Sequence, residues 1–409
     1  MEKLVKNKQY YKFCMYGFLK NLRFFDAFFI LFLLEKNISY TQIGILYAAR
    51  EIFINIFEIP SGVFADTFGR KSSLAGSFVV YILSFTIFYF SSNFWLFLLA
   101  FLLYGLADAF RSGTHKGMIM DYLRLNNAEN LKIKYYGHTR SWSQKGSAIS
   151  SIIAGILVFY SGKYQNIFLY SIIPYILNFF LIISYPKELS GSFIGNNKQS
   201  KLKFANYFKL LFDVLKKPNV LKIINTSAAH TAYLKAIKDY IQIVMLNLAL
   251  IIPLLINFQS EKRNGLIIGI LYFLIYLITS FSSKQSSKIV ELNFKNISLI
   301  TLLLGFIFGI LSGIFYINNL WILSFVSFTS IYIIENIRKP ILTGFISDNV
   351  PNEILTSVIS AQSLLSTIIT ALLAFFFGLF TDFFGLGFSI LIISSFLSIF
   401  SIIFSFISK

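Results

Sequence analysis

The sequence is poor in the residues that cross-link or solubilise a protein. It contains one cysteine, Cys14, in 409 residues, which excludes a disulfide framework and a cysteine-based metal site. Charged residues make up 13% of the chain, whereas soluble domains have about 25%. Acidic residues are especially scarce, since 18 Asp and Glu stand against 36 Lys and Arg. This composition excludes a soluble globular protein.

Apolar residues take the place of the missing charges. They make up 56% of the chain, and the mean hydropathy is +0.70. A membrane-spanning helix needs roughly 20 mostly apolar residues. The apolar runs between polar breaks predict an all-α integral membrane protein with twelve transmembrane helices. We place them at residues 13–34, 41–65, 74–92, 94–121, 141–161, 165–185, 220–246, 264–282, 297–316, 319–345, 354–381 and 385–407.

The longest polar interruption divides these helices six and six. Residues 187–203 are basic and polar, as in a flexible linker, and residues 204–217 repeat apolar residues at helical spacing with lysines between them. We therefore predict three parts. They are an N-terminal six-helix bundle at 1–186, a cytoplasmic linker with an interfacial amphipathic helix at 187–218, and a C-terminal six-helix bundle at 219–409.

Lysine and arginine concentrate in the segments predicted to be cytoplasmic. The loops predicted to be external contain only Lys36, Lys163, Lys262 and Arg263. Because basic residues are retained on the cytoplasmic side, both termini are predicted to be cytoplasmic. The same rule explains the net charge of +18 without nucleic acid. We expect a monomeric, multi-pass protein of a bacterial inner (plasma) membrane, whose partners are the lipid bilayer and a small-molecule substrate.

Charges inside the predicted helices recur in every third helix, starting from the first. A charge at a helix centre costs about 2.5–3.5 kcal/mol, and a Leu, Ile or Phe returns only about 0.3–0.6 kcal/mol. These charges must therefore face protein or a wet cavity, which predicts a common interior lined by helices 1, 4, 7 and 10. The charged residues of these four helices are Lys20, Arg23, Asp26, Asp108, Arg111, Lys116, Lys235, Lys238, Asp239, Glu335, Arg338 and Lys339. Helix 2 adds Arg50, Glu51 and Glu58.

Acid and base lie one helical turn apart in all four of these helices. Neutralisation for membrane insertion explains one such pair, but explains poorly why four corresponding helices each contain one. The spacing is i,i+3 or i,i+4, which places both residues on one helix face. The pairs are Arg23–Asp26, Asp108–Arg111, Lys235–Asp239 and Glu335–Arg338.

The two halves of the sequence also repeat a longer pattern. Asp108 and Arg111 are followed by Asp121, and Glu335 and Arg338 are followed by Asp348, at the same spacing. Transporters built from parallel repeats carry their site at the repeat interface. The pattern therefore favours two copies of one six-helix unit.

The loop between the second and third predicted helices contains a specific motif. It reads Gly62-Val63-Phe64-Ala65-Asp66-Thr67-Phe68-Gly69-Arg70-Lys71. This closely resembles the loop signature of the major facilitator superfamily, except at Thr67, where the family usually has a base. The resemblance implies a cytoplasmic gate in which Asp66 caps the helix that begins near Pro351 and Arg70 pairs with Asp121.

The glycines of this motif have predicted roles of their own. Gly62 would allow helix 2 to approach a neighbour closely, and Gly69 would permit a tight turn. The Gly-rich antiporter signature that ends in Gly-Pro is absent from residues 141–161, so membership of the drug-exporter branch stays open.

These observations predict a secondary transporter that works by alternating access and is not an enzyme. No cofactor or metal is expected beyond an ion gradient, for which we expect H⁺. Substrate is predicted to bind Arg23, Arg111, Lys235 and Arg338, and the excess of interior bases favours an anionic or amphipathic substrate. Carboxylates that must be neutralised before the cavity closes are the coupling candidates. They are Asp26, Asp108, Glu335, Glu51, Glu58 and Asp239.

Several alternatives stay open. Export is favoured slightly over an uptake symporter or a uniporter on the same fold. From other classes, a membrane-embedded transferase and a transport-dead receptor are the rivals. His115 and His230 match no metal spacing and are interpreted as interior histidines, with proton carriage or metal binding as the alternatives.

Overall fold

In the computed structural model, the described residues are 6–112, 114–128, 131–190, 218–253, 257–284, 297–349 and 352–407. Every regular element in these ranges is helical. In chain order they are α1 (Lys8–Lys20), η1 (Phe24–Ala27), α2 (Phe29–Glu35), α3 (Tyr40–Phe68), α4 (Arg70–Phe90), α5 (Phe94–Arg111), α6 (Thr114–Leu125), α7 (Lys132–Ser161), α8 (Asn166–Ile183), η3 (Lys187–Ser190), α10 (Pro218–Ile237), η4 (Lys238–Tyr240), α11 (Ile241–Ile251), α12 (Ser260–Lys284), α14 (Ile297–Ile317), α15 (Trp321–Asn349), α16 (Asn352–Phe384) and α17 (Leu386–Ile407).

Seven helical stretches of the described chain are long and apolar enough to cross a membrane. They are Arg70–Phe90, Phe94–Leu125, Asn166–Ile183, Ser260–Ser282, Ile297–Ile317, Ala361–Phe384 and Leu386–Phe404. Helical segments also occupy the other predicted spans, which contain breaks or more charges. The all-α class with several membrane helices is confirmed. The number twelve and the cytoplasmic termini stay predictions.

The chain divides into two compact units. Unit 1 comprises Met1–Ile38, Ala49–Gly195 and Pro253–Tyr276, and unit 2 comprises Ser39–Ala48, Asn196–Ile252 and Leu277–Lys409. Boundaries between the units thus fall inside α3 and α12 as well as in the centre of the chain. The bundles at 1–186 and 219–409 stay predictions, and most of the predicted linker at 187–218 lies outside the described residues.

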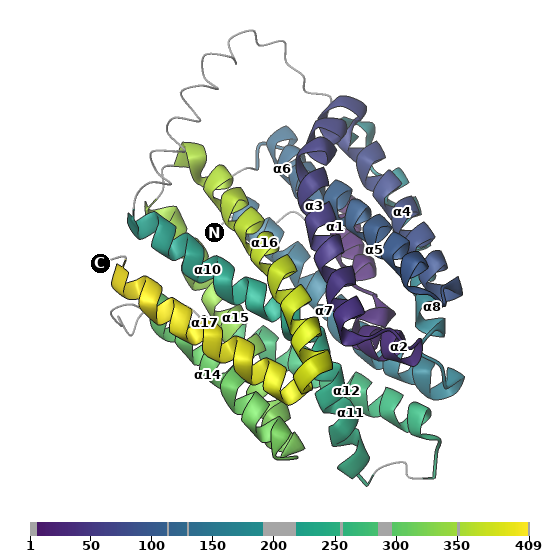
Figure 1. The fold of residues 1–409 in the computed structure, drawn as a ribbon. Helices are drawn as coiled ribbons and strands as arrows, with labels where there is room; N and C mark the ends of the chain where they lie inside the picture. Colours follow the sequence, from purple (N-terminus) through teal and green to yellow (C-terminus); the bar gives the residue numbers. More distant parts are fainter. Residues whose placement is uncertain are drawn as a thin grey trace. The chain divides into compact units, whose positions relative to one another are not determined.

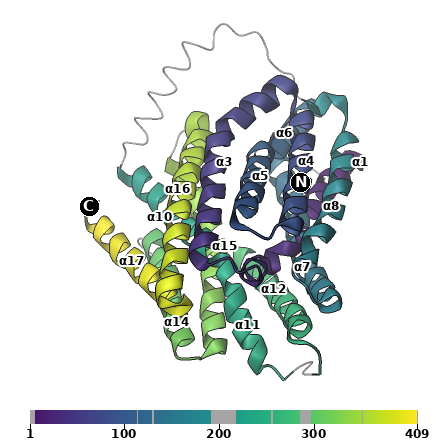
Figure 2. The ribbon, with the colours of Figure 1, turned by 45° about the vertical axis from the view of Figure 1, so that its right-hand side comes forward.

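In unit 1, α4 packs against α5 and α8, and α1 packs against α7 and α8 (Figures 1 and 2). Phenylalanine rings fill much of this core, with Phe25 and Phe29 both packed on Phe168. The approach of α1 to α7 depends on a glycine. A Cβ built on Gly146 would lie 2.5 Å from the carbonyl oxygen of Phe18, so a larger residue would push the two helices apart.

In unit 2, α14 packs against both α15 and α17, and α10 packs against α15 and α16 (Figure 1). The α14–α15 contact includes two buried serines. The Ser312 hydroxyl donates to the backbone oxygen of Ser324 at 3.1 Å, and the Ser324 hydroxyl donates to that of Ser312 at 3.0 Å. Such small polar residues let membrane helices pack closely while their hydroxyl groups remain hydrogen-bonded.

Three of the four charged spans are interrupted helices. The helix predicted over 13–34 is instead α1, η1 and α2, and Asn21 ends α1 by donating its side-chain amide to the Gly17 carbonyl at 2.7 Å. The fourth span divides into α5 and α6, and the seventh into α10, η4 and α11. Irregular backbone at membrane depth is tolerated where it is buried in protein or lines a cavity. The breaks therefore mark the charged spans as interior elements.

Candidate functional site

The first charge cluster of unit 1 lies in the broken first span. Arg23 and Asp26 form an ion pair of 2.9 Å, and both side chains are a little under one-third exposed. The Arg23 guanidinium also donates through Nη1 to the Tyr104 hydroxyl of α5 at 3.0 Å. This hydrogen bond joins the first predicted span to the fourth, and the common interior of helices 1, 4, 7 and 10 stays a prediction.

A second cluster lies at the end of α5 and comprises Asp108, Arg111 and Tyr81. Arg111 donates through Nη2 to Asp108 Oδ1 at 2.6 Å and through Nε to the Tyr81 hydroxyl at 2.9 Å. The Tyr81 hydroxyl in turn donates to the same Asp108 carboxylate. Two of the three guanidinium nitrogens are thus engaged, and Nη1 of Arg111 has no hydrogen-bond partner among the described residues.

The acidic residues of α3 differ in their surroundings. Glu51 is buried and forms an ion pair of 2.8 Å with its neighbour Arg50. Near Pro60, the Ser61 hydroxyl bonds the backbone oxygens of Glu58 at 2.9 Å and of Ala109 at 3.0 Å. This serine, which the motif analysis did not single out, thus links α3 to α5 beside the proline.

The structure describes most residues of the gate motif, but not the side chain of Asp66. Arg70 forms the expected ion pair with Asp121 of α6, and Gly69 adopts φ +93° immediately before α4, as a tight turn requires. No close neighbour faces Gly62 among the described residues, since a Cβ built there would meet nothing within 4 Å. The side chain of Asp66 and the start of its expected partner helix at Pro351 lie outside the described residues.

Unit 2 contains a buried acid next to a histidine. Glu335 of α15 lies 2.7 Å from Nδ1 of His230 in α10, and the Thr231 hydroxyl donates to its other oxygen at 2.6 Å. His230 is fully buried, and its Nε2 has no hydrogen-bond partner among the described residues. Gly305 of α14 faces that ring, because a Cβ built on it would overlap His230 Nε2.

Arg338 forms no ion pair with Glu335 among the described residues, although the i,i+3 spacing favours one. Its guanidinium donates to the backbone oxygens of Ser298 at 2.6 Å and Thr226 at 2.9 Å, and to the Thr301 hydroxyl at 2.5 Å. The residue is 1% exposed. Arg338 therefore ties α10, α14 and α15 together, and its predicted role in substrate binding stays untested.

The last predicted pair is also rearranged. Oδ1 of Asp239 lies 3.8 Å from Nζ of Lys238, and its Oδ2 accepts a hydrogen bond of 2.8 Å from the Tyr47 hydroxyl. Lys235, the predicted partner, belongs to the last turn of α10. The cause is the 3₁₀ turn η4, which breaks the helical register between residues 235 and 239. Helices 7 and 10 still meet here, since the Tyr332 hydroxyl donates to the Lys238 carbonyl at 2.6 Å.

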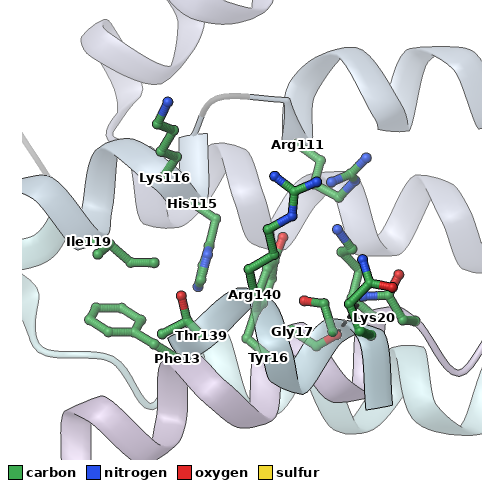
Figure 3. A pocket seen from close by; sticks show the side chains of 13 residues that line it. Phe13, Tyr16, Gly17, Lys20, Arg111, His115, Lys116, Ile119, Thr139 and Arg140 are labelled. Carbon is green, nitrogen blue, oxygen red and sulfur yellow. Dashed lines mark hydrogen bonds between the residues drawn. The ribbon is translucent and has the colours of Figure 1, made fainter. Parts of the chain in front are cut away.

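A basic cavity of about 290 Å³ lies in unit 1 between α1, the α5–α6 junction and α7 (Figure 3). Its lining residues include four Lys or Arg and no Asp or Glu. They are Phe13, Tyr16, Gly17, Lys20, Asn21, Arg111, His115, Lys116, Ile119, Thr139, Arg140, Ser143 and Gln144. The guanidinium groups of Arg111 and Arg140 point into the same space, whereas the Lys116 chain extends away from them (Figure 3).

Lys20 and Arg140 are cavity cations that were not predicted as site residues. Lys20 is visible from sequence as a charge inside the first span, but its place at the end of α1 depends on the helix break. Arg140 lies one residue before the predicted fifth span and so counts as a loop charge. His115 stacks on Tyr16 with ring centroids 3.6 Å apart, as expected for a packed interior histidine.

Comparison with known proteins agrees with this architecture. The family described as Major Facilitator Superfamily matches residues 17–374. An uncharacterised MFS-type transporter of Bacillus subtilis (strain 168), YxaM, is 26% identical over 389 residues, which cover 94% of this chain and 92% of that protein.

Solved structures share the fold. The nucleoside transporter NupG aligns with a TM-score of 0.74 at 12% identity over 98% of this chain and all of that one. A D-xylose–proton symporter aligns with a TM-score of 0.68 at 14% identity over 95% of both chains. The family match over most of the chain shows that the chain belongs to the major facilitator superfamily and is an integral membrane transporter, not an enzyme.

Proposed function

We propose that this protein is a proton-coupled secondary transporter that moves a small molecule by alternating access, with Glu335 and His230 as its proton site. The supporting observation is the difference between the partners of four carboxylates inside the predicted spans. Asp26, Asp108 and Glu51 each face an arginine, whose charge is permanent. Glu335 faces His230, whose side-chain type changes charge near neutral pH.

The geometry of this pair defines where a proton would bind. An ionised Glu335 can only accept hydrogen bonds, so the hydrogen on His230 Nδ1 points toward it and Nε2 is left without a proton. Protonation of Nε2 would create an imidazolium beside the carboxylate. Alternatively, protonation of Glu335 would leave both groups neutral. Either step changes the charge of a site that contains almost no water-exposed surface.

Burial links this charge change to conformation. Charging a group in a low-dielectric site is costly, so the proton must arrive and leave while the site is hydrated. In alternating access, hydration differs between the two states, and a proton can thus bind in one state and leave in the other. Arg338 lies one turn further along α15 but stays bound to backbone carbonyls, so it supplies a fixed positive charge.

The first step of the test is to find a transported solute. The purified protein is screened by thermal unfolding against small metabolites, among which we include a nucleoside and xylose because the solved neighbours are named for them. Ligands that bind the folded state raise its unfolding temperature. Each stabilising solute is then added to proteoliposomes that contain a pH-sensitive dye.

We expect solute movement to change the internal pH for the parent protein. Glu335→Gln should abolish the pH change, and Glu261→Gln, which alters an exposed acid in the first turn of α12, should leave it intact. The sign of the change distinguishes export by antiport, which the sequence slightly favours, from symport. Solute movement without any pH change in the parent, or with an undiminished change in Glu335→Gln, would disprove the proposed coupling.

A further inference from the structure

We infer that the basic cavity of unit 1 binds the negative group of a small organic anion, a carboxylate or a phosphate, through Lys20, Arg111 and Arg140. This inference names the substrate class of the proposed transporter and rests on that proposed function. It differs from the expectation based on sequence, in which Arg23, Lys235 and Arg338 join Arg111. The structure brings a different set of cations together.

The charge balance of the cavity favours an anion. Three cations converge on one space whose lining includes no carboxylate. Asp108, which lies in α5 like Arg111, already binds Nε and Nη2 of that arginine. Lys20 and Arg140 form no ion pair with any acid of the described residues. Repulsion between like charges is strong where water is scarce, and a bound anion removes it.

The available donors also match an anion. Arg111 has its Nη1 without a partner among the described residues, whereas its other two nitrogens are fixed by Asp108 and Tyr81. This anchoring holds the guanidinium in one orientation before a ligand arrives, which lowers the entropic cost of binding. A guanidinium suits a carboxylate or phosphate because it is permanently charged and its N–H groups donate charge-assisted hydrogen bonds.

Neutral side chains complete the lining. Thr139 and Ser143 contribute hydroxyl groups from α7, and Asn21 contributes an amide from the end of α1. The stacked Tyr16 and His115 rings form the aromatic part of the lining. The volume of about 290 Å³ is at the lower end of the roughly 300–1,000 Å³ of drug-sized pockets. The expected ligand is therefore the size of a small metabolite.

The fold explains why these cations meet. Lys20 is the last residue of α1 and Arg111 the last residue of α5, where positive charge also interacts favourably with the helix dipole. Arg140 is brought beside them by the close packing of α7 on α1 at Gly146. Each cation thus comes from a different helix.

The test measures ligand binding to the purified full-length protein by thermal unfolding. The probes are inorganic phosphate, lactate and neutral glycerol at one ionic strength, which is balanced with sodium chloride. We expect phosphate or lactate, but not glycerol, to raise the unfolding temperature. Lys20→Gln and Arg140→Gln should each raise the anion concentration needed for half the effect by roughly ten-fold or more, because a charged donor is lost.

The matched control is Lys163→Gln, an exposed lysine of the same unit outside the cavity, which should behave like the parent. Arg140→Gln alters an exposed side chain and keeps the test decisive if Lys20→Gln fails to fold. Stabilisation by phosphate alone would assign a phosphate group, and stabilisation by lactate alone a carboxylate. The inference is overturned if neither anion stabilises the parent, or if both Gln variants respond to anions as the parent does.

The result is independent of proton coupling, because no pH gradient is applied and Glu335 is unchanged. Loss of coupling in Glu335→Gln with normal anion binding would support the cavity and the proton site together. Normal anion binding with no proton movement in the parent would retain the cavity and reject the proton site.

Discussion

At the scale of single residues, the partner of a buried charge decides what the charge can do. Arg111 and Tyr81 both donate to the carboxylate of Asp108. Protonation of Asp108 would therefore leave Arg111 without its negative partner. Glu335 has neutral or titratable partners instead, His230 and Thr231. Residues with the same acid–base spacing in sequence therefore have different chemistry in the structure.

Gly305 offers a test of the His230 site that leaves all charges in place. A Cβ at Gly305 would overlap the imidazole ring, so Gly305→Ala must displace His230 from Glu335 or move α14. We expect a loss of about 1–3 kcal/mol in the free energy of unfolding, as overpacking usually costs, together with weaker proton coupling. Thermal unfolding and the proteoliposome pH assay measure the two effects.

Gly76 is the control for this substitution. It lies inside α4, and a Cβ built on it meets nothing within 4 Å. Gly76→Ala should be neutral or stabilising by up to about 1 kcal/mol, because alanine favours the helix. Equal effects of the two substitutions would show that Gly305 makes no special room for His230.

At the scale of helices and segments, the sequence predicted which helices are charged but not where they break. The cost of burying charge identifies spans 1, 4, 7 and 10 without coordinates. The breaks at Asn21, Ser112 and Lys238 have no proline at those positions. Asn21 and the Ser112-Gly113 pair are weak local signals, which the long apolar runs around them outweighed. Charged side chains near the breaks form hydrogen bonds with neighbouring helices, as Arg23 does by donating to Tyr104.

A helix cap in unit 2 was also not predicted. Asp382 near the end of α16 accepts hydrogen bonds from the backbone N–H groups of Tyr40 at 3.0 Å and Thr41 at 2.7 Å, at the start of α3. The two segments are more than 300 residues apart, so no local pattern joins them. An anion at a helix N-terminus satisfies free N–H groups and interacts favourably with the dipole.

Removal of this cap should destabilise the protein. We expect Asp382→Ala to lower the free energy of unfolding by about 0.5–2 kcal/mol, as lost N-caps do. Asp382→Asn should cost less, because the amide oxygen can still accept a hydrogen bond. Unfolding midpoints of the two variants measure this order, and an Asp382→Ala midpoint equal to that of the parent would contradict the capping role.

At the scale of the whole molecule, the repeat seen in sequence does not give two equivalent halves. Asp108 binds Arg111 in unit 1, whereas the corresponding Glu335 binds His230 and the corresponding Arg338 binds backbone carbonyls in unit 2. Unit 1 has the basic cavity and unit 2 the titratable pair. The spacing of these residues in sequence predicts the repeat, but it could not predict that the two sets have different partners, because those partners come from other helices.

If the two units work together, binding in one must depend on protonation in the other, since coupling between sites is reciprocal. The measurement is the affinity of the purified protein for the anion that binds it, lactate or phosphate, between pH 5 and 8, corrected for the titration of the anion itself. We expect the parent affinity to change by roughly ten-fold or more across this range, where histidine changes charge. In Glu335→Gln the affinity should depend much less on pH, with a contribution left only from His115, which lines the cavity. An affinity that is equally constant in the parent, or that changes just as steeply in Glu335→Gln, would contradict proton coupling through unit 2.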